Sequence, residues 1–382
     1  MQASDRSPAK APRKRLIAAG AVAGVALVAS ACGSSTKSSS SPTTVSSSAS
    51  STAAPASTSA KFLGCMVTDT GGINDHSFNE TSWEGMQAAA AANPNITVKY
   101  LQSTSSSDYV PNIQAFEKQN CGIIVTVGFD MATATKQAAT ADPSQKFAIV
   151  DNKYTHQLPN LLGISYETNQ DAFLGGYLAA AMSKSGVVGT FGGQNIPTVT
   201  IYMSGWVAGV RYYNQLNHAN VKVLGWDPNT NQGTFTGSFT DQAQGKLVTE
   251  NMMSNGADII FPVAGGVGLG AAAAVQAAGP PHYMEWVDTD GCVSASQYCS
   301  IFITSVTKGL FNSVRDVVES AANGTFKGGT YVGTLANGGV GLAPYHDFAS
   351  KIPASVQSEI TKLKAGIEAG TISVDPLKYP AS

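Results

Sequence analysis

The sequence has little charge and few groups suited to catalysis. Charged residues make up 13% of its 382 residues, and the basic ones form no stripe of the kind that nucleic-acid binding requires. The five histidines lack the clustered spacing of a metal centre. No G-x-S-x-G motif marks a nucleophilic serine. We therefore expect no nucleic-acid partner, no metal, no cofactor and no enzymatic activity.

An apolar run near the start of the chain, LIAAGAVAGVALVASAC, is shorter than the roughly 20 residues that a membrane span needs. Basic residues precede it and small residues follow, which predicts an export signal over residues 1–31. The ending Ala-Ser-Ala-Cys resembles the lipobox of bacterial lipoproteins, although Ala29 stands where Leu is usual. That resemblance implies lipid attachment at Cys32. An ordinary signal cleaved after Ala31 is the alternative.

Residues 32–60 are rich in Ser, Thr and Ala and contain few large apolar side chains, which predicts a tether. Removing residues 1–31 takes away five of 23 basic and one of 25 acidic residues, so the remaining chain has a formal charge of 18 − 24 = −6. The folded part begins near Lys61. Its length, 382 − 60 = 322 residues, exceeds what one core normally organises and predicts two lobes.

Apolar runs rich in Val, Ile and Phe alternate with alanine-rich helical patterns, which indicates an α/β fold with parallel sheets. The expected strands are 62–68, 96–102, 122–128, 146–151 and 161–166, followed by a second series at 187–193, 221–226, 257–265 and 283–288. The expected helices are 78–92, 108–119, 131–140, 170–183, 205–217, 241–255 and 268–278. The tail from Thr304 favours one more helix, a strand with a glycine-rich connection, and a helix at 355–369. Ligands should bind at the carboxyl ends of these strands.

The stretch VTDTGGINDHSFNETSWEGM places polar residues and an aromatic in a turn between strand and helix. Ser77 and Glu80 match a capping box. Phe78, at the first helical position, either completes the core or offers its face to a flat ligand. Asp69, at the end of the strand, either caps the turn or accepts hydrogen bonds in a cleft.

Later segments offer further candidates. Gly266, Gly268 and Ala271 match the dinucleotide fingerprint, but their place deep in an exported chain argues against a nicotinamide cofactor. Asp288 and Asp290 end a strand, and their i, i+2 spacing would let both carboxylates face a cleft. As a metal site this pair is weak, and capping of a turn is an equal alternative.

Other residues have simpler interpretations. Lys308 lies at a strand-to-helix junction, where it either faces a cleft or is solvated, and Trp206 within a helix favours a core position. Cys292 and Cys299 are close enough in sequence for a local disulfide, while Cys65 and Cys121 lie in or beside strands and could form a second.

Seven sequence blocks, in the same order along the chain, resemble the basic membrane protein family of bacterial lipoproteins. The first is the stretch VTDTGGINDHSFNETSWEGM described above, and the others are FAIVD, GWVAGVRYYN, GSFTDQAQGK, VAGGVGLG, WVDTDG and TSVTKG. The resemblance spans Phe62 to Pro344, with departures at Trp206 and Val267. It implies a type I periplasmic-binding-protein fold, in which three strands cross between two doubly wound α/β lobes. The lobes would be residues 61–166 plus 290–327 and residues 167–289 plus 328–382.

The resemblance also implies a ligand site. The family's first stacking aromatic corresponds to Phe78, with Asn79 beside it, and the second corresponds to Phe239. Other family positions, which contact the base or the ribose, fall on Asp69, Asp151, Gly265, Gly266, Asp288 and Lys308.

The implied protein is a monomer, anchored by lipid to the extracytoplasmic face of the cell membrane. It would capture a purine nucleoside and deliver it to the permease and nucleotide-binding subunits of an ABC importer. The alternatives are a surface receptor of the same fold without a transporter, and a nucleoside hydrolase that uses Asp288 and Asp290.

Overall fold

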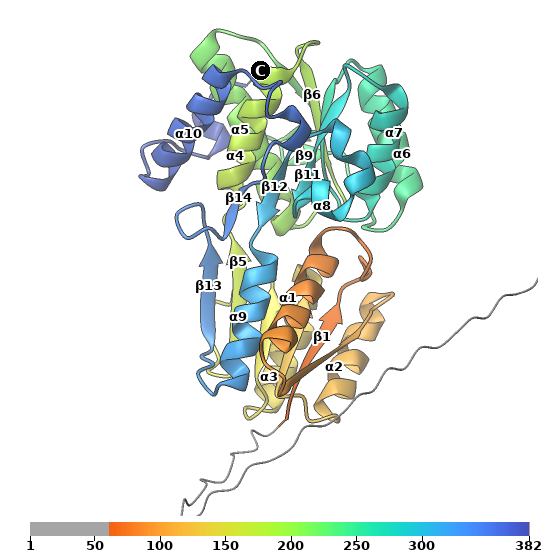
Figure 1. The fold of residues 1–382 in the computed structure, drawn as a ribbon, viewed down its shortest axis with the longest axis vertical. Helices are drawn as coiled ribbons and strands as arrows, with labels where there is room; N and C mark the ends of the chain where they lie inside the picture. Colours follow the sequence, from red (N-terminus) through yellow and green to blue (C-terminus); the bar gives the residue numbers. More distant parts are fainter. Residues whose placement is uncertain (1–60, 382) are drawn as a thin grey trace, which may run out of the picture. The chain divides into compact units, whose positions relative to one another are not determined.

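The computed structural model describes residues 61–381, which form two six-stranded sheets and a small two-stranded one (Figure 1). The predicted signal at 1–31, the tether at 32–60 and the lipid on Cys32 lie outside the described residues. Within residues 61–381, no helix combines the length and the apolar character needed to cross a membrane.

The first sheet is entirely parallel and defines lobe 1. Its strand order is β13-β5-β4-β3-β1-β2. The strands are β1 (Phe62–Thr68), β2 (Ile96–Leu101), β3 (Ile123–Val127), β4 (Phe147–Val150), β5 (Leu161–Tyr166) and β13 (Gly329–Gly333). Its helices are α1 (Phe78–Ala92), α2 (Tyr109–Glu117), α3 (Ala132–Ala141) and α9 (Leu310–Ala322), with the short 3-10 turns η1 (Ser106–Asp108) and η2 (Phe129–Met131). Helices α1 and α9 lie side by side (Figure 1).

The second sheet defines lobe 2, in the order β14-β12-β11-β10-β6-β7, with only β14 antiparallel to its neighbour. Its strands are β6 (Val187–Gly192), β7 (Lys222–Leu224), β10 (Ile259–Val263), β11 (Tyr283–Asp288), β12 (Phe302–Lys308) and β14 (Val340–Leu342). A separate hairpin joins β8 (Trp226–Asp227) and β9 (Gln232–Gly233). The helices are α4 (Asn169–Met182), α5 (Pro197–Asn217), α6 (Gln242–Ser254), α7 (Val267–Ala278), α8 (Gly291–Ser294) and α10 (Ala354–Glu368), with 3-10 turns η3 (Ser296–Ile301), η4 (His346–Phe348) and η5 (Pro376–Lys378).

The inner strands, such as β3, β4 and β10, are apolar on both faces, as expected where helices cover both sides of a sheet. In β1, successive side chains point to opposite faces. Met66 joins the core that contains Met86 of α1 and Val314 of α9, whereas Val67 joins the core beneath α2 and α3. Every residue of β3 and β4 is buried, which explains why the sequence shows continuous apolar runs rather than alternation there.

Helices α4 and α5 pack unusually close together because glycines lie between them. A Cβ atom at Gly176 would overlap the carbonyl oxygen of Trp206, and one at Gly209 would overlap the carbonyl oxygen of Phe173. Any larger side chain at these positions would force the helices apart.

The chain crosses between the lobes three times, which confirms the predicted type I architecture. The crossings run from β5 to α4, from β12 to α9, and from β13 to β14. Each joins an element of one sheet to an element packed in the other lobe. The carboxyl ends of the parallel strands therefore meet where the lobes face each other.

The limits of the lobes differ from the prediction that residues 290–327 belong to lobe 1 and 328–382 to lobe 2. Strand β12 pairs with β11 and β14 in the sheet of lobe 2, while β13 pairs with β5 in lobe 1. The predicted limits are wrong at these two strands because strand pairing, which the sequence pattern does not reveal, decides which lobe holds each strand.

Two element boundaries also need correction. The tail from Thr304 begins inside strand β12, and its helix starts only at Leu310. Helix α5 begins at Pro197, eight residues before the predicted start at 205. Proline suits the first helical position, where its missing N–H needs no partner, so this start was readable from the sequence.

Two disulfides connect the cysteines of the described residues. Cys65 of β1 bonds to Cys121 just before β3, across a Cα–Cα distance of 6.0 Å. Cys292 bonds to Cys299, with their Cα atoms 4.5 Å apart, and closes the loop that contains α8 and part of η3. The structure therefore contains both pairs that the sequence suggested.

Candidate functional site

A pocket lies between the lobes, at the carboxyl ends of β1, β4, β10, β11 and β12. Its empty space is about 480 Å³ when the open mouth is included. The structure brings together at this pocket nearly all the residues that the sequence singled out: Asp69, Phe78, Asn79, Asp151, Phe239, Gly265, Asp288 and Lys308. They come from segments far apart in the chain, because the ends of parallel strands converge at one edge of each sheet.

Asp69 and Asn79 form one end of the pocket. Asp69 Oδ1 accepts hydrogen bonds from the Gly71 N–H at 2.8 Å and from Asn79 Nδ2 at 2.9 Å. Burial raises the pKa of Asp69 to about 6, although these two donors oppose the shift. Oδ1 of Asn79 is buried and has no hydrogen-bond partner within residues 61–381. Because the amide nitrogen faces carboxylates, this oxygen is an acceptor without a partner among the described residues, and it belongs to a residue that lines the pocket.

The start of α1 is capped by Asp75 rather than by Ser77. The Asp75 carboxylate accepts from the backbone N–H groups of Ser77 at 3.0 Å, Asn79 at 2.8 Å and Glu80 at 3.1 Å. Glu80 instead accepts from the N–H of His76. The predicted Ser77–Glu80 capping box is therefore wrong, because a neighbouring carboxylate already satisfies the free N–H groups of the first turn. Burial raises the pKa of Asp75 to about 7.

Lys308 joins the two lobes through a pair of carboxylates. Its Nζ lies 2.7 Å from Oδ2 of Asp151, after β4 in lobe 1, and 3.3 Å from Oδ1 of Asp288, at the end of β11 in lobe 2. Burial opposes the charge of Lys308 most strongly, but the two carboxylates outweigh it and raise the lysine pKa. Burial raises the pKa of Asp151, against the lowering effect of Lys308. All three side chains are less than a tenth exposed.

Both carboxylates sit on left-handed backbone. The φ angles are 67° at Asp151 and 70° at Asp288. Such angles are uncommon for residues other than glycine, and aspartate tolerates them better than most. The conformation ends each strand abruptly and aims the carboxylate across the pocket.

Asp288 is the most heavily bonded acceptor at this end. Tyr202 Oη of α5 donates to Oδ1 at 3.1 Å, and Ser77 Oγ of lobe 1 lies 3.1 Å from Oδ2 and 3.0 Å from the carbonyl oxygen of Val287. Ser77 thus contacts lobe 2 directly. This contact, rather than helix capping, is the role of its hydroxyl.

Aromatic and apolar side chains form the remaining walls. Phe78 is half-buried, and Lys308 Nζ lies 4.8 Å from the centre of its ring. Phe239 lies so close to Gly193 that a Cβ atom there would overlap its ring. Further apolar lining comes from Phe129, Ile196, Val199, Val263 and Ala264. Both phenylalanines therefore border the pocket while part of each ring packs on the core.

The lining combines four carboxylates with one cation: Asp69, Asp75, Asp151 and Asp288 against Lys308. Carboxylates accept hydrogen bonds and repel anions, so the site suits a neutral ligand that is rich in N–H and O–H donors and also has an apolar face.

Two predicted positions lie elsewhere. Gly266 is the N-cap of α7 and does not line the pocket. Asp290 turns away: its carboxylate accepts from the N–H of Cys292 at 3.0 Å and contacts His346 at 2.8 Å. Of the two interpretations left open for this pair, the shared cleft is wrong for Asp290, which instead caps the start of α8. The i, i+2 rule applies to extended backbone, and Asp288 has φ 70°.

Trp206 is a core residue, as its place in a helix indicates. It is fully buried, stacks on Phe261 with ring centres 5.9 Å apart, and its Nε1 donates to Glu285 Oε2 at 2.8 Å. Burial raises the pKa of Glu285 to about 8, with the indole N–H opposing the shift.

Among the lining residues that the predicted site lacked, three have polar or aromatic side chains close to its predicted members: Tyr202, Phe129 and Asp75. Tyr202 precedes residue 205, where the helix was predicted to start, and Pro197 was the available signal for the earlier start. Phe129 follows β3, at a strand end where ligand contacts are expected. Asp75 was visible in the turn, but nothing in the local pattern distinguished its role from that of Ser77.

The comparisons with known proteins agree with this architecture. A family model described as "ABC transporter substrate-binding protein PnrA-like" matches residues 62–375. The "ABC transporter nucleoside-binding protein BmpA" of Lactococcus lactis subsp. cremoris is 30% identical over 327 residues, which cover 81% of this chain and 88% of that protein. "Basic membrane protein D" of Borreliella burgdorferi is 30% identical over 330 residues, covering 84% and 90%.

A solved structure shares the fold. A solute-binding protein of an ABC transporter system from Aeropyrum pernix K1 superposes with a TM-score of 0.74 at 24% identity, covering 82% of this chain and 92% of that one.

Proposed function

The chain belongs to the PnrA-like family of ABC transporter substrate-binding proteins, and on that premise we propose that its pocket binds a purine nucleoside. The observation that carries the proposal is the pairing of carboxylates with phenylalanine rings around one space. A nucleoside has a flat apolar base, N–H donors on the edge of that base, and a neutral sugar with adjacent hydroxyl groups. These features complement the lining side chains.

At the base end, Phe78 and Phe239 offer apolar surface to the faces of the heterocycle. Asp69 and the unpartnered Oδ1 of Asn79 accept hydrogen bonds from its N–H groups. The backbone of Gly265, with φ 53°, lies along the pocket wall where no side chain intervenes.

At the sugar end, Asp288 and Asp151 accept hydrogen bonds from the ribose hydroxyls, and Lys308 donates to the ribose oxygens. Binding would exchange part of the existing contact among these three groups for contacts with the sugar. A phosphate is unfavourable here because one lysine faces four carboxylates. We therefore propose a nucleoside rather than a nucleotide.

The two lobes are proposed to close over the ligand by bending at the three crossings. A lipid on Cys32 would hold the protein at the extracytoplasmic face of the membrane, next to the permease that receives the nucleoside. The family model and the relative from Lactococcus lactis are both described as binding proteins of ABC transporters, which supports a role without catalysis.

The test is isothermal titration calorimetry of the full chain with inosine, adenosine and guanosine, and with the matching 5′-monophosphates. At least one nucleoside should bind at a 1:1 ratio, and its monophosphate at least about tenfold more weakly, a difference of about 1.4 kcal/mol. The absence of binding to all three nucleosides would refute the ligand class.

Substitutions locate the site. Phe78→Ala and Asp288→Ala should each weaken binding at least about tenfold, in line with about 1–3 kcal/mol for a stacked base. Phe311→Ala is the matched control, because this aromatic is 38% exposed on α9 and does not line the pocket. Wild-type affinity in both site variants would contradict the assignment.

A further inference from the structure

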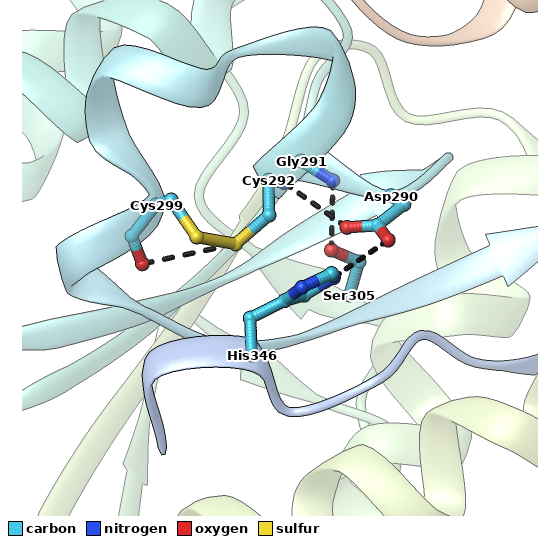
Figure 2. Close-up of a disulfide and its surroundings, with 6 residues drawn as sticks. All are labelled: Asp290, Gly291, Cys292, Cys299, Ser305 and His346. Atoms are coloured by element: carbon cyan, nitrogen blue, oxygen red, sulfur yellow. Dashed lines mark hydrogen bonds and ion pairs between the residues drawn. A yellow bond between two sulfur atoms is a disulfide. The ribbon is translucent and has the colours of Figure 1, made fainter. Parts of the chain in front are cut away.

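The loop after β11 and the start of η4 together form a second group of reactive side chains, outside the ligand pocket. Figure 2 shows Asp290 and His346 beside the Cys292–Cys299 disulfide. Asp290 Oδ2 and His346 Nε2 are 2.8 Å apart, and Asp290 Oδ1 accepts from the N–H of Cys292 at 3.0 Å. The N–H of Gly291 donates to Ser305 Oγ at 3.0 Å, which ties the start of the loop to β12.

Donor atoms of this loop and of His346, at the start of η4, are close enough to share one ion. A carboxylate oxygen of Asp290, the sulfur of Cys292 and a ring nitrogen of His346 all lie within 4.8 Å of one another. The sulfur of Cys299 is bonded to that of Cys292 and so adds a fourth candidate at the same place. Zn²⁺ is bound tetrahedrally by cysteine, histidine and carboxylate ligands in combinations of this kind.

We propose that reduction of the Cys292–Cys299 disulfide creates a binding site for a zinc-like divalent cation, with Cys292, Cys299, Asp290 and His346 as its ligands. In the disulfide neither sulfur is a thiolate, the form that ligates a metal. The disulfide therefore closes the site, and its reduction opens it.

The chemistry balances with a dithiol as reductant. The dithiol supplies two electrons and two protons, the S–S bond of the loop breaks to give two thiols, and the reductant becomes a disulfide. Binding of the cation then releases the two thiol protons to solvent. His346 ligates through a neutral ring nitrogen, and its contact with Asp290 is exchanged for contacts to the ion.

A reductant can reach this disulfide selectively. Cys292 and Cys299 are both partly exposed, and Val293 between them is 75% exposed. By contrast, Cys65 is fully buried and Cys121 is only 4% exposed. Mild reduction should therefore open the loop disulfide and leave the other intact. The site shares no residue with the ligand pocket, so the proposal stands apart from the proposed function.

The experiment uses the full chain carrying Cys32→Ser, which removes the fifth thiol. After mild treatment with a dithiol and its removal under anaerobic, metal-free conditions, alkylation and mass spectrometry should count two thiols per chain. Co²⁺ is then the probe, because a cobalt thiolate site gives a charge-transfer absorption. The absorption should saturate at one Co²⁺ per reduced chain, disappear when Zn²⁺ is added, and be absent from the oxidised chain.

Variants identify the ligands. Asp290→Asn keeps an acceptor for the N–H of Cys292, and both this change and His346→Ala should weaken Zn²⁺ binding at least about tenfold. Cys292→Ser with Cys299→Ser should abolish the charge-transfer absorption. Asp347→Asn, at an exposed position next to His346, is the matched control and should bind as the parent does. Thermal unfolding of each variant checks that the fold is retained.

Two results would overturn the proposal. One is a folded, reduced chain that binds no Co²⁺ or binds it without thiolate absorption. The other is Zn²⁺ affinity that is unchanged by both His346→Ala and Asp290→Asn.

Discussion

Replacement of Lys308 by methionine tests what holds the lobes together. Methionine has a similar length and keeps the apolar stem, but it removes the ammonium that lies 2.7 Å from Asp151 and 3.3 Å from Asp288. The two carboxylates belong to different lobes, so the substitution leaves two acidic groups facing each other across the pocket with no cation between them.

The size of the destabilisation follows from how deeply the lysine and the two carboxylates are buried. The Lys308 side chain is 4% exposed and the carboxylates 8% and 9%. Removing one partner of such a buried pair typically costs about 3–5 kcal/mol, because the remaining charge is left without compensation. The chain can avoid part of this cost by opening, since separation of the lobes returns both carboxylates to water. At 1.4 kcal/mol per factor of ten, the full cost corresponds to a factor of about 10² to 4 × 10³, so we expect the open-to-closed ratio to rise by up to that factor.

The effect should depend on pH in a defined direction. Burial raises the pKa of Asp151, and Lys308 lowers it, so loss of the lysine moves that pKa further up. An acid whose pKa is higher in the folded state binds more protons when folded, and its stability falls as pH rises through that pKa. The destabilisation by Lys308→Met should accordingly be smaller at pH 5 than at pH 7, because a protonated Asp151 no longer repels Asp288.

The assays are urea unfolding and small-angle X-ray scattering of the ligand-free protein at both pH values. Lys362→Met is the matched control: Lys362 pairs with Glu359 at 3.0 Å but its side chain is 70% exposed, so its loss should change little. The reasoning is refuted if Lys308→Met matches the wild type in unfolding midpoint and radius of gyration at pH 7, or if its defect grows as the pH is lowered.

Two further changes test other parts of the structure. An ionised carboxylate accepts an N–H hydrogen bond more strongly than a protonated carboxyl group does, and burial raises the pKa of Asp69 to about 6, so nucleoside affinity measured by calorimetry should fall as the pH drops below that value. Asp69→Asn should bind weakly with no pH dependence in the same range, and an equally strong pH dependence in this variant would contradict the role of Asp69. Gly176→Ala should lower the free energy of unfolding in urea by about 1–3 kcal/mol, because its methyl group would overlap the carbonyl oxygen of Trp206. An unchanged unfolding midpoint would contradict this, because it would mean that α4 and α5 can move apart without any loss of stability.

Much of the fold was predictable because it depends on local patterns. Continuous apolar runs identify strands that are buried on both faces, and alanine-rich segments between them identify the covering helices. The carboxyl ends of parallel strands share one edge of a sheet, so residues such as Asp69, Asp151 and Asp288 could be assigned to one cleft from their positions at strand ends. The family motif added Phe78 and Lys308, whose local surroundings alone favoured simpler roles.

The tertiary structure decided what depends on distant partners. The lobe that holds β12 or β13 is set by strand pairing, which leaves no mark in either strand's own sequence. Ser77 was available to cap α1, but the path of the turn brings Asp75 to the free N–H groups and leaves the serine hydroxyl to contact lobe 2. Asp290 points away from the pocket because the left-handed backbone at Asp288 reverses the direction that strand periodicity predicts. Composition and periodicity thus determine which elements form, whereas backbone reversals and contacts between distant segments determine which side chains meet.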